Sequence, residues 1–460
     1  MKNKDNVLVS EARELALDLV HDILENGAYA NLSLEKTLRS SNLAHIDKNL
    51  VTEIVNGSIR MTKHLDWVLT LFLKKSMEKQ NPWLRNILRI SAYQLLFMER
   101  IPDYAVVNSA VDLCHKKTSK TLAGVCNGVL RNLIRSRDKL TYPPTNSLEY
   151  LAVYYSQPEW LIRLWLDEYG AEITENILKY LNQKPPLTLR NNNLLSTPEQ
   201  LCQDLCQDGV VATLSPLVAE SIRVDSMDKG IEELTTYQSG RFYVQNEAAM
   251  LAAVILDPQA GERILDLCSG IGGKATHFAE KMNNQGLVKA VELHQHKLLI
   301  LKNNCQRLGI NIVEAAQYNI LEMTAAEQLW QRVFLDVPCS GLGVLNRRAD
   351  ARWRKNPQEI KELARLQQDL IRKAGEMVAP DGILLYSTCT VNQAENEAII
   401  SEFMAENHEF KLDPFGDLIP FIPLDAADRV NAERGWLTLL PGKYDTDGMF
   451  YARLRRSNAV

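Results

Sequence analysis

Two cysteines in the C-terminal half follow short apolar segments that have the composition of buried β-strands. Cys389 stands near the end of residues 384–390, LLYSTCT, and Cys339 stands in residues 333–341, VFLDVPCSG. In an open α/β sheet, ligands bind just outside the carboxyl ends of the strands. A thiol at such an end faces a ligand rather than the core. The sequence therefore predicts that two strands of one sheet each bring a cysteine to the same edge.

Two thiols beside an acid suit the methylation of carbon-5 of a pyrimidine. This carbon is a weak nucleophile, but addition of a thiolate to C6 turns it into an enamine-like nucleophile. After methyl transfer, a base must remove the C5 proton so that the thiolate can leave. The chemistry asks for a nucleophilic thiol, a base and an acid that contacts the ring nitrogens. Cys389, Cys339 and Asp336 can fill these roles, with Cys389 as the expected nucleophile. A nearby cation or helix N-terminus would have to lower the pKa of this thiol from its usual value of about 8.5.

A glycine-rich turn, DLCSGIGGK over residues 266–274, follows another predicted strand and opens a predicted helix. Glycines let the backbone approach a ligand closely, and the N–H groups at a helix start attract electron-rich groups. A phosphate-binding P-loop is excluded, because Cys268 stands where it needs its first glycine and Ala275 follows Lys274. Glu292 ends the next predicted strand, where an acid can bind ribose hydroxyls. The turn and this acid predict an adenosine-containing cofactor, and both a dinucleotide and S-adenosylmethionine (SAM) stay open.

A basic segment, NRRADARWRK over residues 346–355, lies between the two cysteines. Cations bind RNA phosphates, and an aromatic ring offers a surface on which a base can stack. A solvated loop that pairs with nearby acids is the alternative. We expect RNA contacts from six of its side chains: Arg347, Arg348, Arg352, Trp353, Arg354 and Lys355.

The elements that must position these residues divide the chain into three parts. Residues 1–141 carry apolar residues at helical spacing in seven segments, which predicts an all-α bundle. The basic end of this bundle is a candidate phosphate contact and holds Arg131, Arg135, Arg137 and Lys139. Residues 237–460 alternate strands with helices, which predicts an α/β fold with a doubly wound sheet of about seven strands.

The middle part, residues 146–236, begins with a helical linker and continues as short alternating segments around one helix. We expect a small α+β module that lays a sheet against RNA, with Arg190 as one contact, while a structural connector is the alternative. Cys202 and Cys206 lie one helical turn apart in this module. Because no second pair of ligands is nearby, we expect them to form a buried helix face and not a metal site.

The composition limits where the protein works and what it binds. With 46% hydrophobic and 24% charged residues, the chain is typical of a soluble globular protein. It has no apolar run of the roughly 18 residues that a membrane span needs. Eight cysteines without paired spacing indicate free thiols in a reducing cytoplasm. Residues 1–140 hold 21 Lys and Arg against 15 Asp and Glu, whereas the remainder is acidic, and this asymmetry favours an anionic partner. We expect a cytoplasmic monomer without a metal or a membrane contact.

The chain resembles the RNA (cytosine-5) methyltransferase family, also called NOL1/NOP2/Sun, in its two cysteine motifs, its glycine turn and the DTDGMF of residues 445–450. It resembles the helical domain named after the antitermination factor NusB in residues 55–60, 89–96 and 127–131. The resemblance implies a NusB-like bundle, a small RNA-binding α+β module and a Rossmann-like SAM methyltransferase domain. This combination is similar to bacterial enzymes that methylate 16S rRNA, which implies a cytosine of 16S rRNA as the substrate, before full subunit assembly. A cytosine of tRNA or of another rRNA site, and an RNA-binding factor that has lost catalysis, are the alternatives.

The resemblance also implies roles for single residues. Cys389 matches the residue that attacks C6, Cys339 matches the one that helps to release the product, and Asp336 matches an acid near cofactor and base. Residues 243–246, YVQN, match a segment that borders the site. The implied SAM-binding positions are Cys268, Ser269, Gly270, Ile271, Gly272, Gly273, Lys274, Glu292 at the ribose, Gln317 near the adenine, and Asp336.

Four positions depart from the family pattern. Ile271 stands in place of Pro, Gly270 in place of Ala, and Thr390 in place of Ser. Gln317 stands in place of Asp, but a Gln side chain can still donate and accept hydrogen bonds. We therefore expect SAM binding to weaken rather than to vanish, and catalysis to persist.

Overall fold

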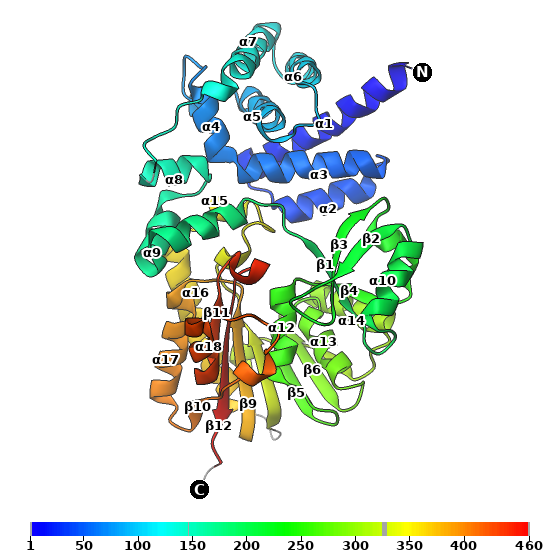
Figure 1. The fold of residues 1–460 in the computed structure, drawn as a ribbon, viewed down its shortest axis with the longest axis vertical. Coiled ribbons are helices and arrows are strands. Elements are labelled where there is room, and N and C mark those ends of the chain that lie inside the picture. The colour runs from blue at the N-terminus through cyan, green and yellow to red at the C-terminus, as the bar shows by residue number, and fades with distance from the viewer. Residues whose placement is uncertain (1, 146, 324–328, 459–460) are drawn as a thin grey trace. The chain divides into compact units, whose positions relative to one another are not determined.

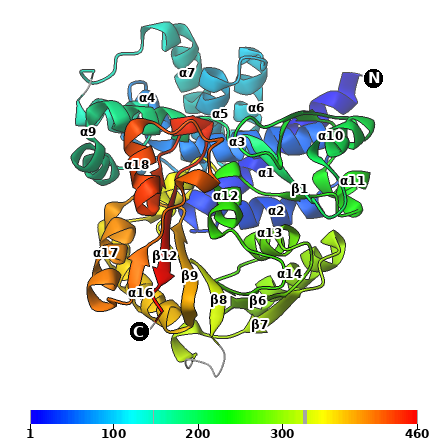
Figure 2. The ribbon, with the colours of Figure 1, turned by 60° about the horizontal axis from the view of Figure 1, so that its bottom comes forward.

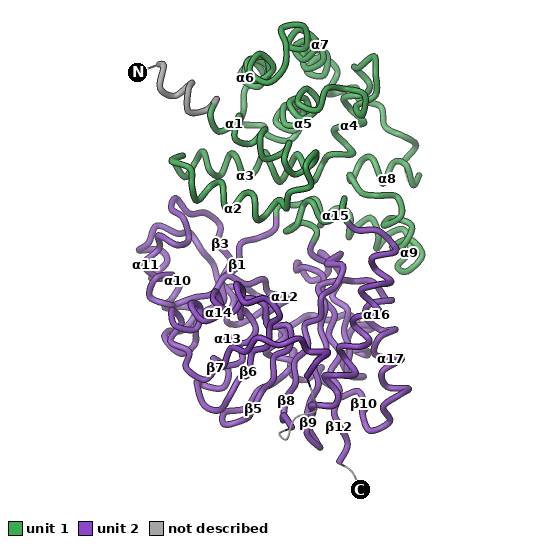
Figure 3. The backbone as a smooth tube through the Cα atoms, turned by 180° about the vertical axis from the view of Figure 1, so that it is seen from behind, with its two compact units in different colours: residues 1–184, 345–354 green, residues 185–344, 355–460 purple. Residues whose placement is uncertain are grey.

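The computed structural model describes residues 2–145, 147–323 and 329–458 of the chain. The chain divides into two compact units, which Figure 3 shows in different colours. Unit 1 comprises residues 1–184 and 345–354, and unit 2 comprises residues 185–344 and 355–460. Most of the basic segment between the two cysteines therefore belongs to unit 1, although both cysteines belong to unit 2.

Unit 1 is built from helices, as the spacing of its apolar residues predicts (Figure 1). Its first seven helices are α1 (Lys2–Glu25), α2 (Ala30–Ser40), α3 (His45–Arg60), α4 (Thr62–Thr70), α5 (Pro82–Phe97), α6 (Asp103–Lys117) and α7 (Lys120–Ser136). The Asn81 side chain caps α5 by accepting hydrogen bonds from the N–H groups of Trp83 and Leu84. All seven helices contribute apolar side chains to one core, which confirms the predicted all-α bundle.

Unit 1 continues through α8 (Leu148–Tyr154) and α9 (Glu159–Leu181), and it includes the short α15 (Ala351–Arg354). Gly170 interrupts α9 because its φ of 76° is left-handed. Among the described residues, no helix is both long and apolar enough to cross a membrane.

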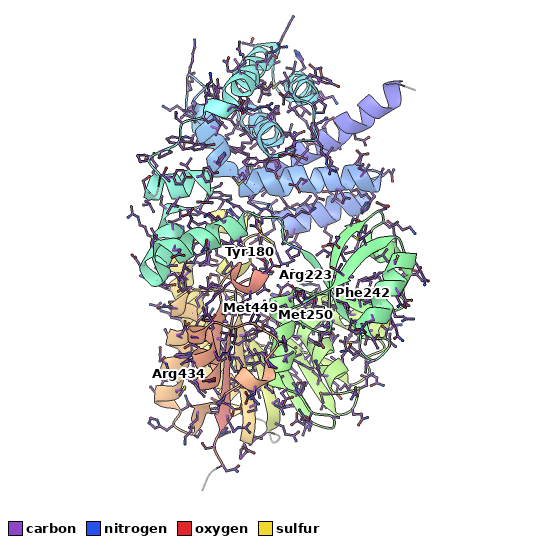
Figure 4. All side chains as sticks on the ribbon, in the orientation of Figure 1. Tyr180, Arg223, Phe242, Met250, Arg434 and Met449 are labelled. Atoms are coloured by element: carbon purple, nitrogen blue, oxygen red, sulfur yellow. The ribbon has the colours of Figure 1, made fainter. Side chains whose placement is uncertain are left out.

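Unit 2 begins with a small antiparallel sheet in the order β2-β3-β1-β4. Its strands are β1 (Leu187–Asn191), β2 (Val210–Leu214), β3 (Ser221–Met227) and β4 (Phe242–Val244). Helix α10 (Pro198–Gln207) packs against this sheet, and Phe242, labelled in Figure 4, is buried in their shared core. This arrangement confirms the expected small α+β module.

Helix α10 turns only one of its sides toward the small sheet. Leu201 and Leu205 are fully buried there, whereas Cys202 is half-buried and Cys206 is exposed. The expectation that both cysteines lie on a buried face is therefore wrong for Cys206, because one turn of an amphipathic helix places residue 206 beyond the apolar stripe.

The large sheet of unit 2 has the strand order β10-β12-β9-β8-β5-β6-β7, with β11 paired to β12. These strands are β5 (Arg263–Leu267), β6 (Leu287–Glu292), β7 (Val313–Gln317), β8 (Trp330–Asp336), β9 (Val378–Thr388), β10 (Phe410–Leu412), β11 (Trp436–Leu439) and β12 (Met449–Arg456). The other helices of unit 2 are α11 (Thr235–Gln238), α12 (Glu247–Leu256), α13 (Gly273–Lys281), α14 (Gln295–Leu308), α16 (Pro357–Glu376), α17 (Glu397–Glu406) and α18 (Ala426–Arg434). The predicted α/β fold is confirmed, and β11 and β12 form the antiparallel pair expected late in the chain.

Successive residues of each strand point to opposite faces of the large sheet. Both faces carry apolar side chains, and helices cover both of them. Ile264 of β5 packs into one core with α12, α13 and α14. Its neighbour Leu265 packs into a second core with α16 and α17. Figure 2 shows α16 and α17 apart from α13 and α14. Met250 and Met449, labelled in Figure 4, belong to the first core.

The chain changes its direction across the sheet at β5. Strands β6 and β7 follow on one side of β5, whereas β8 and β9 follow on the other, and all five are parallel. A ligand crevice lies outside the carboxyl ends of the strands at such a reversal. Strands β5, β8 and β9 end at Leu267, Asp336 and Thr388, so the glycine turn and both cysteine loops leave the sheet at this edge.

Candidate active site

The two cysteines meet at the carboxyl edge of the large sheet. Strands β8 and β9 pair in parallel with Asp336 opposite Ser387, so the loops that follow them start side by side. The Sγ atoms of Cys339 and Cys389 lie 3.4 Å apart, and neither cysteine forms a disulfide among the described residues. The structure thus brings together the two thiols that the sequence places at this edge.

The two thiols form one hydrogen bond, in which either sulfur can be the donor. The hydrogen bond to Cys389, together with burial, raises the pKa of Cys339 well above its ordinary value. A raised pKa favours the protonated form of Cys339, which can donate its hydrogen to the sulfur of Cys389. A sulfur that accepts a hydrogen bond is stabilised in its anionic form, which suits a nucleophile.

A half-buried ion pair lies beside the thiols. The Asp336 carboxylate accepts one hydrogen bond from Lys274 Nζ at 2.6 Å and another from Ser387 Oγ at 3.0 Å. Burial alone would lower the pKa of Lys274, but the charges of Asp336 and Cys389 outweigh it and raise this pKa. Lys274 is thus the nearby cation that a reactive thiol requires, whereas the sequence pointed to it only as part of the cofactor turn.

Hydroxyl groups and one buried acid join the two cysteine loops. Ser340 Oγ lies 2.8 Å from Thr390 Oγ1, so Thr390 supplies the hydroxyl that a Ser would. Glu395, fully buried, accepts the Ser340 N–H at 2.9 Å and the Ser340 hydroxyl. Gln367 donates to Glu395 at 3.0 Å and also to the carbonyl of Pro338. Glu395 was not predicted as a site residue, although an acid within the polar run 392–396 after Cys389 was a usable signal.

The C-terminal DTDGMF motif closes on the same loops through two glycines. Gly343 donates its N–H to the carbonyl of Cys389 at 3.0 Å, and Gly448 donates its N–H to the carbonyl of Gly343 at 2.8 Å. A Cβ at Gly448 would lie 2.6 Å from the Cα of Gly343. The motif is therefore glycine at this position because two backbones meet there.

We expect Gly448→Ala to destabilise the protein by about 1–3 kcal/mol, the usual cost of overpacking, and to lower activity by displacing the cysteine loops. Gly128→Ala is the matched control, because a Cβ at Gly128 would meet no atom within 4 Å. Thermal unfolding of both variants measures the difference. Equal melting temperatures would mean that the close approach at Gly448 does not constrain the fold.

A cavity of about 290 Å³ lies against the glycine turn. Gly272 adopts a left-handed φ of 89°, and a Cβ there would lie 2.7 Å from Leu301. The turn therefore needs glycine both for its conformation and for its packing. The predicted cofactor residues that line the cavity are Cys268, Ser269, Gly270, Ile271, Gly273, Lys274 and Asp336. Tyr243, Gln245 and Asn246, from the segment expected to border the site, line it as well.

Asp266 adds to this cavity a carboxyl group that was not predicted as a site residue. It is fully buried, and neither carboxylate oxygen has a hydrogen-bond partner among the described residues. Burial raises the pKa of Asp266 well above its ordinary value, although Lys274 opposes this shift. A buried carboxyl group without a partner is costly, so it fits a site that receives a cationic ligand.

Glu292 and Gln317 lie at the same sheet edge but do not line the cavity. Glu292 is buried and accepts the Gly270 N–H at 3.1 Å, so it holds the glycine turn in place. Gln317 is exposed and donates to the carbonyl of Leu293 at 3.1 Å. Their assignment to the ribose and the adenine stays a prediction.

Three of the residues expected to contact RNA are instead structural parts of unit 1. Arg352 is fully buried, Trp353 Nε1 donates to the carbonyl of Ile59 at 2.7 Å, and Arg354 pairs with Asp350 at 2.8 Å. These side chains contact other residues of unit 1. The composition of the segment predicts cations and a ring, but not whether they point to solvent or into the fold. Arg348 is exposed and Arg347 is half-buried. Lys355, in unit 2, pairs with Glu359.

Arg190 is also buried and cannot contact RNA as expected. Its guanidinium group forms an ion pair with Glu280 at 2.7 Å and a hydrogen bond with Thr276 Oγ1 at 3.0 Å. It also donates to Gln245 and to the carbonyl of Gly273. Arg190 thus connects β1 to α13 and to the cofactor turn.

Comparisons with known proteins give a consistent result across the chain. Three family models match: the NusB family over residues 10–135, a ferredoxin-like domain of RsmF/B-like methyltransferases over residues 157–229, and 16S rRNA methyltransferase RsmB/F over residues 253–455. A probable ribosomal RNA small subunit methyltransferase B of Bacillus subtilis is 32% identical over 97% of this chain and 99% of its own length. The corresponding protein of Synechocystis is 34% identical over the same shares.

Solved structures agree with this result. The crystal structure of PH0851 matches with a TM-score of 0.79 and 26% identity, over 97% of this chain and 99% of that one. NSun6 from Pyrococcus horikoshii, solved with SFG, has a TM-score of 0.58 and 21% identity over 66% of this chain and 99% of its own, which is a likeness of fold.

Proposed function

Because the chain belongs to the RsmB/F family of 16S rRNA methyltransferases, we propose that it methylates carbon-5 of a cytosine in 16S rRNA, using SAM and a covalent adduct with Cys389. The observation that carries the proposal is the 3.4 Å contact between the sulfurs of Cys389 and Cys339 beside the Lys274–Asp336 ion pair. Two adjacent thiols supply the nucleophile and the base that this reaction needs.

Cys389 starts the reaction by forming a bond between its sulfur and C6 of the cytosine. The electron pair of the C5–C6 double bond then becomes available at C5. The hydrogen bond from Cys339 and the positive charge of Lys274 favour the thiolate form of Cys389. SAM, when bound, supplies the electrophilic methyl group.

Cys339 completes the reaction by acting as the base. The negative charge of Cys389 and the hydrogen bond to its sulfur both raise the pKa of Cys339. Once the sulfur of Cys389 is bonded to carbon, it loses this charge and no longer accepts this hydrogen bond, so the pKa of Cys339 falls. Cys339 can then lose its proton to solvent and take the proton from C5. The electrons of the C5–H bond restore the double bond, and the C6–S bond breaks with Cys389 leaving as a thiolate. The same contact therefore protects the proton of Cys339 before the adduct forms and releases it afterwards.

The residues around the cavity fit SAM. The glycine turn lines the cavity, and Asp266, whose carboxylate oxygens have no hydrogen-bond partner among the described residues, offers a carboxyl group for the α-ammonium group of the cofactor. Lys274 and Asp336 line both the cavity and the approach to the thiols, which suits a methyl donor placed between turn and cysteines.

Arg348 remains a predicted RNA contact, because it is exposed.

We expect Asp266→Asn to weaken SAM binding by about tenfold or more, the loss of one charge-assisted contact. Because cation binding favours the ionised carboxyl group, the affinity of the wild type should rise as the pH rises through the raised pKa of Asp266. The variant should lack this rise. Calorimetric titration with SAM at several pH values measures both effects. Glu314→Gln, an exposed acid on β7, is the matched control.

The function is tested by incubating the protein with labelled SAM and unmethylated 16S rRNA, with 30S particles and tRNA in parallel. We expect label on a cytosine C5 of 16S rRNA. Label on tRNA alone would show that the substrate is tRNA and not 16S rRNA. Retained RNA binding without any SAM affinity would favour an RNA-binding factor that has lost catalysis.

A further inference from the structure

Unit 1 contains a second large cavity, of about 550 Å³, which the proposed reaction does not use. It is lined by the ends of α3, α5 and α9, by α4 and α8, and by the segment that follows α7. Six rings line it: His64, Tyr93, Phe97, Tyr142, Tyr154 and Tyr155.

The rings hold one another in place, yet two of them stay open to solvent. Tyr154 stacks on Tyr150 with the ring centres 5.0 Å apart, and Tyr142 meets Tyr154 edge-on at 5.4 Å. His64 meets Phe97 edge-on at 5.5 Å. Phe97 and Tyr154 nevertheless remain 42% and 40% exposed. These ring faces are exposed and already fixed by their neighbours. A base can therefore stack on them without the loss of side-chain conformational entropy that binding otherwise costs.

The charged groups of the cavity are all cations. Arg60, Arg137 and Lys179 line it, and no Asp or Glu belongs to its lining among the described residues. Asp103 pairs with Arg137 and Glu175 pairs with Lys179, each at 3.0 Å, from outside the lining. A guanidinium group has five N–H donors, so Arg137 keeps donors for a ligand.

Arg60 is the group that most requires a ligand. It is only 8% exposed, and one Nη donates to the carbonyl of Asn346 at 3.2 Å. Its Nε has no hydrogen-bond partner among the described residues. A buried donor without a partner is costly, so an anion or another acceptor in the cavity would relieve it.

We propose that this cavity binds one unstacked nucleotide of single-stranded RNA, with its base on the rings of Phe97 and Tyr154 and its phosphate near Arg60, Arg137 and Lys179. Every base has a π-face, so ring stacking captures a nucleotide without fixing its sequence. The cations supply the complementary charge that an apolar peptide would not need. The proposal rests on the proposed function only in taking RNA as the ligand, and it places a second RNA contact outside the catalytic unit.

The test uses the full-length protein and a fluorescein-labelled single-stranded RNA of about eight nucleotides, within the usual site size for such binders. We expect Phe97→Ala and Tyr154→Leu each to weaken binding about tenfold, because stacking of one base contributes roughly 1–3 kcal/mol. Tyr154→Phe keeps the ring and should bind as the wild type does. Tyr104→Ala removes a 72% exposed ring of unit 1 that does not line the cavity, so it should leave the affinity unchanged.

The charge contribution is measured separately. We expect Arg137→Gln to lower the slope of log affinity against log salt by about 0.7, the value for one phosphate contact on a single strand. Arg39→Gln, which removes a cation of α2 outside the cavity, should leave the slope unchanged. Thermal unfolding confirms that each variant is folded.

Crosslinking locates the RNA directly. An RNA that contains 4-thiouridine should crosslink to peptides that hold Phe97 or Tyr154. The proposal fails if the two ring variants bind like Tyr104→Ala, or if crosslinks avoid these peptides. RNA binding is measured in the Cys389→Ala background, so that it is separate from catalysis. If the two ring variants bind RNA as tightly as the parent there, only the proposed nucleotide site is overturned. If the wild type transfers no methyl group, only the proposed function is overturned.

Discussion

Cys389→Ala is expected to abolish methyl transfer, lowering turnover by at least about 10³-fold, because without the sulfur C5 of the cytosine stays a weak nucleophile. The effect should be on turnover rather than on cofactor affinity, since Cys389 does not line the cavity at the glycine turn. Transfer of label from SAM to RNA measures the turnover. Cys206→Ala, which removes an exposed thiol of α10, is the matched control and should be fully active.

Cys339→Ala should give a different result from Cys389→Ala. It leaves the nucleophile in place but removes the group that we assign to C5 proton removal, so the adduct should form and persist. A denaturing gel should then show a protein species shifted by bound RNA, which Cys389→Ala and the double variant lack. Normal turnover by Cys339→Ala would contradict its role as the base, and the proton would have to leave by another route.

The main elements of this site could be predicted because their signals are local. Short apolar runs that end in Asp336 and Thr388 predict buried strands, and parallel strands deliver their ends to one edge of a sheet. Glycines in a strand-to-helix turn likewise predict a ligand turn. The cysteine pair and the cavity could therefore be placed without coordinates.

The supporting residues could not be predicted because their partners are distant in sequence. Glu395 is paired with Ser340, 55 positions away, and nothing near Glu395 indicates that it is buried. In the sequence, Asp266 is an ordinary residue of a predicted strand. Only the structure shows that its carboxylate oxygens have no hydrogen-bond partner among the described residues. Burial and hydrogen bonding depend on tertiary packing, which local patterns do not encode.

The basic segment between the cysteines shows the same limit for charge. Five cations in ten residues predict an anion contact only if they point to solvent. Arg352 instead donates to groups of residues 60, 156, 181 and 182, up to 292 positions away. A charge pattern gives the number of cations in a loop and not their direction.

Arg352→Ala should destabilise unit 1 by about 3–5 kcal/mol, the range for removing one member of a buried polar network. Arg352 is fully buried, and its guanidinium group donates to the carbonyls of Arg60 and Leu181, the last residues of α3 and α9. Helix C-termini carry unpaired carbonyls and partial negative charge, so a cation stabilises both ends at once. Burial lowers the pKa of Arg352 to about 9, so the group is still charged at pH 7. Denaturant unfolding measures the loss.

Two further variants separate this role from RNA binding. Arg352→Met fills most of the space but leaves the carbonyls unpaired, so it should still lose about 2 kcal/mol, at 1–3 kcal/mol per unsatisfied group. Arg348→Ala, the matched exposed control four residues earlier, should keep full stability and lose RNA affinity. If Arg352→Met were as stable as the wild type, the guanidinium group would not be capping the helices. If Arg352→Ala kept its stability and lost only RNA affinity, the segment would be an RNA contact after all.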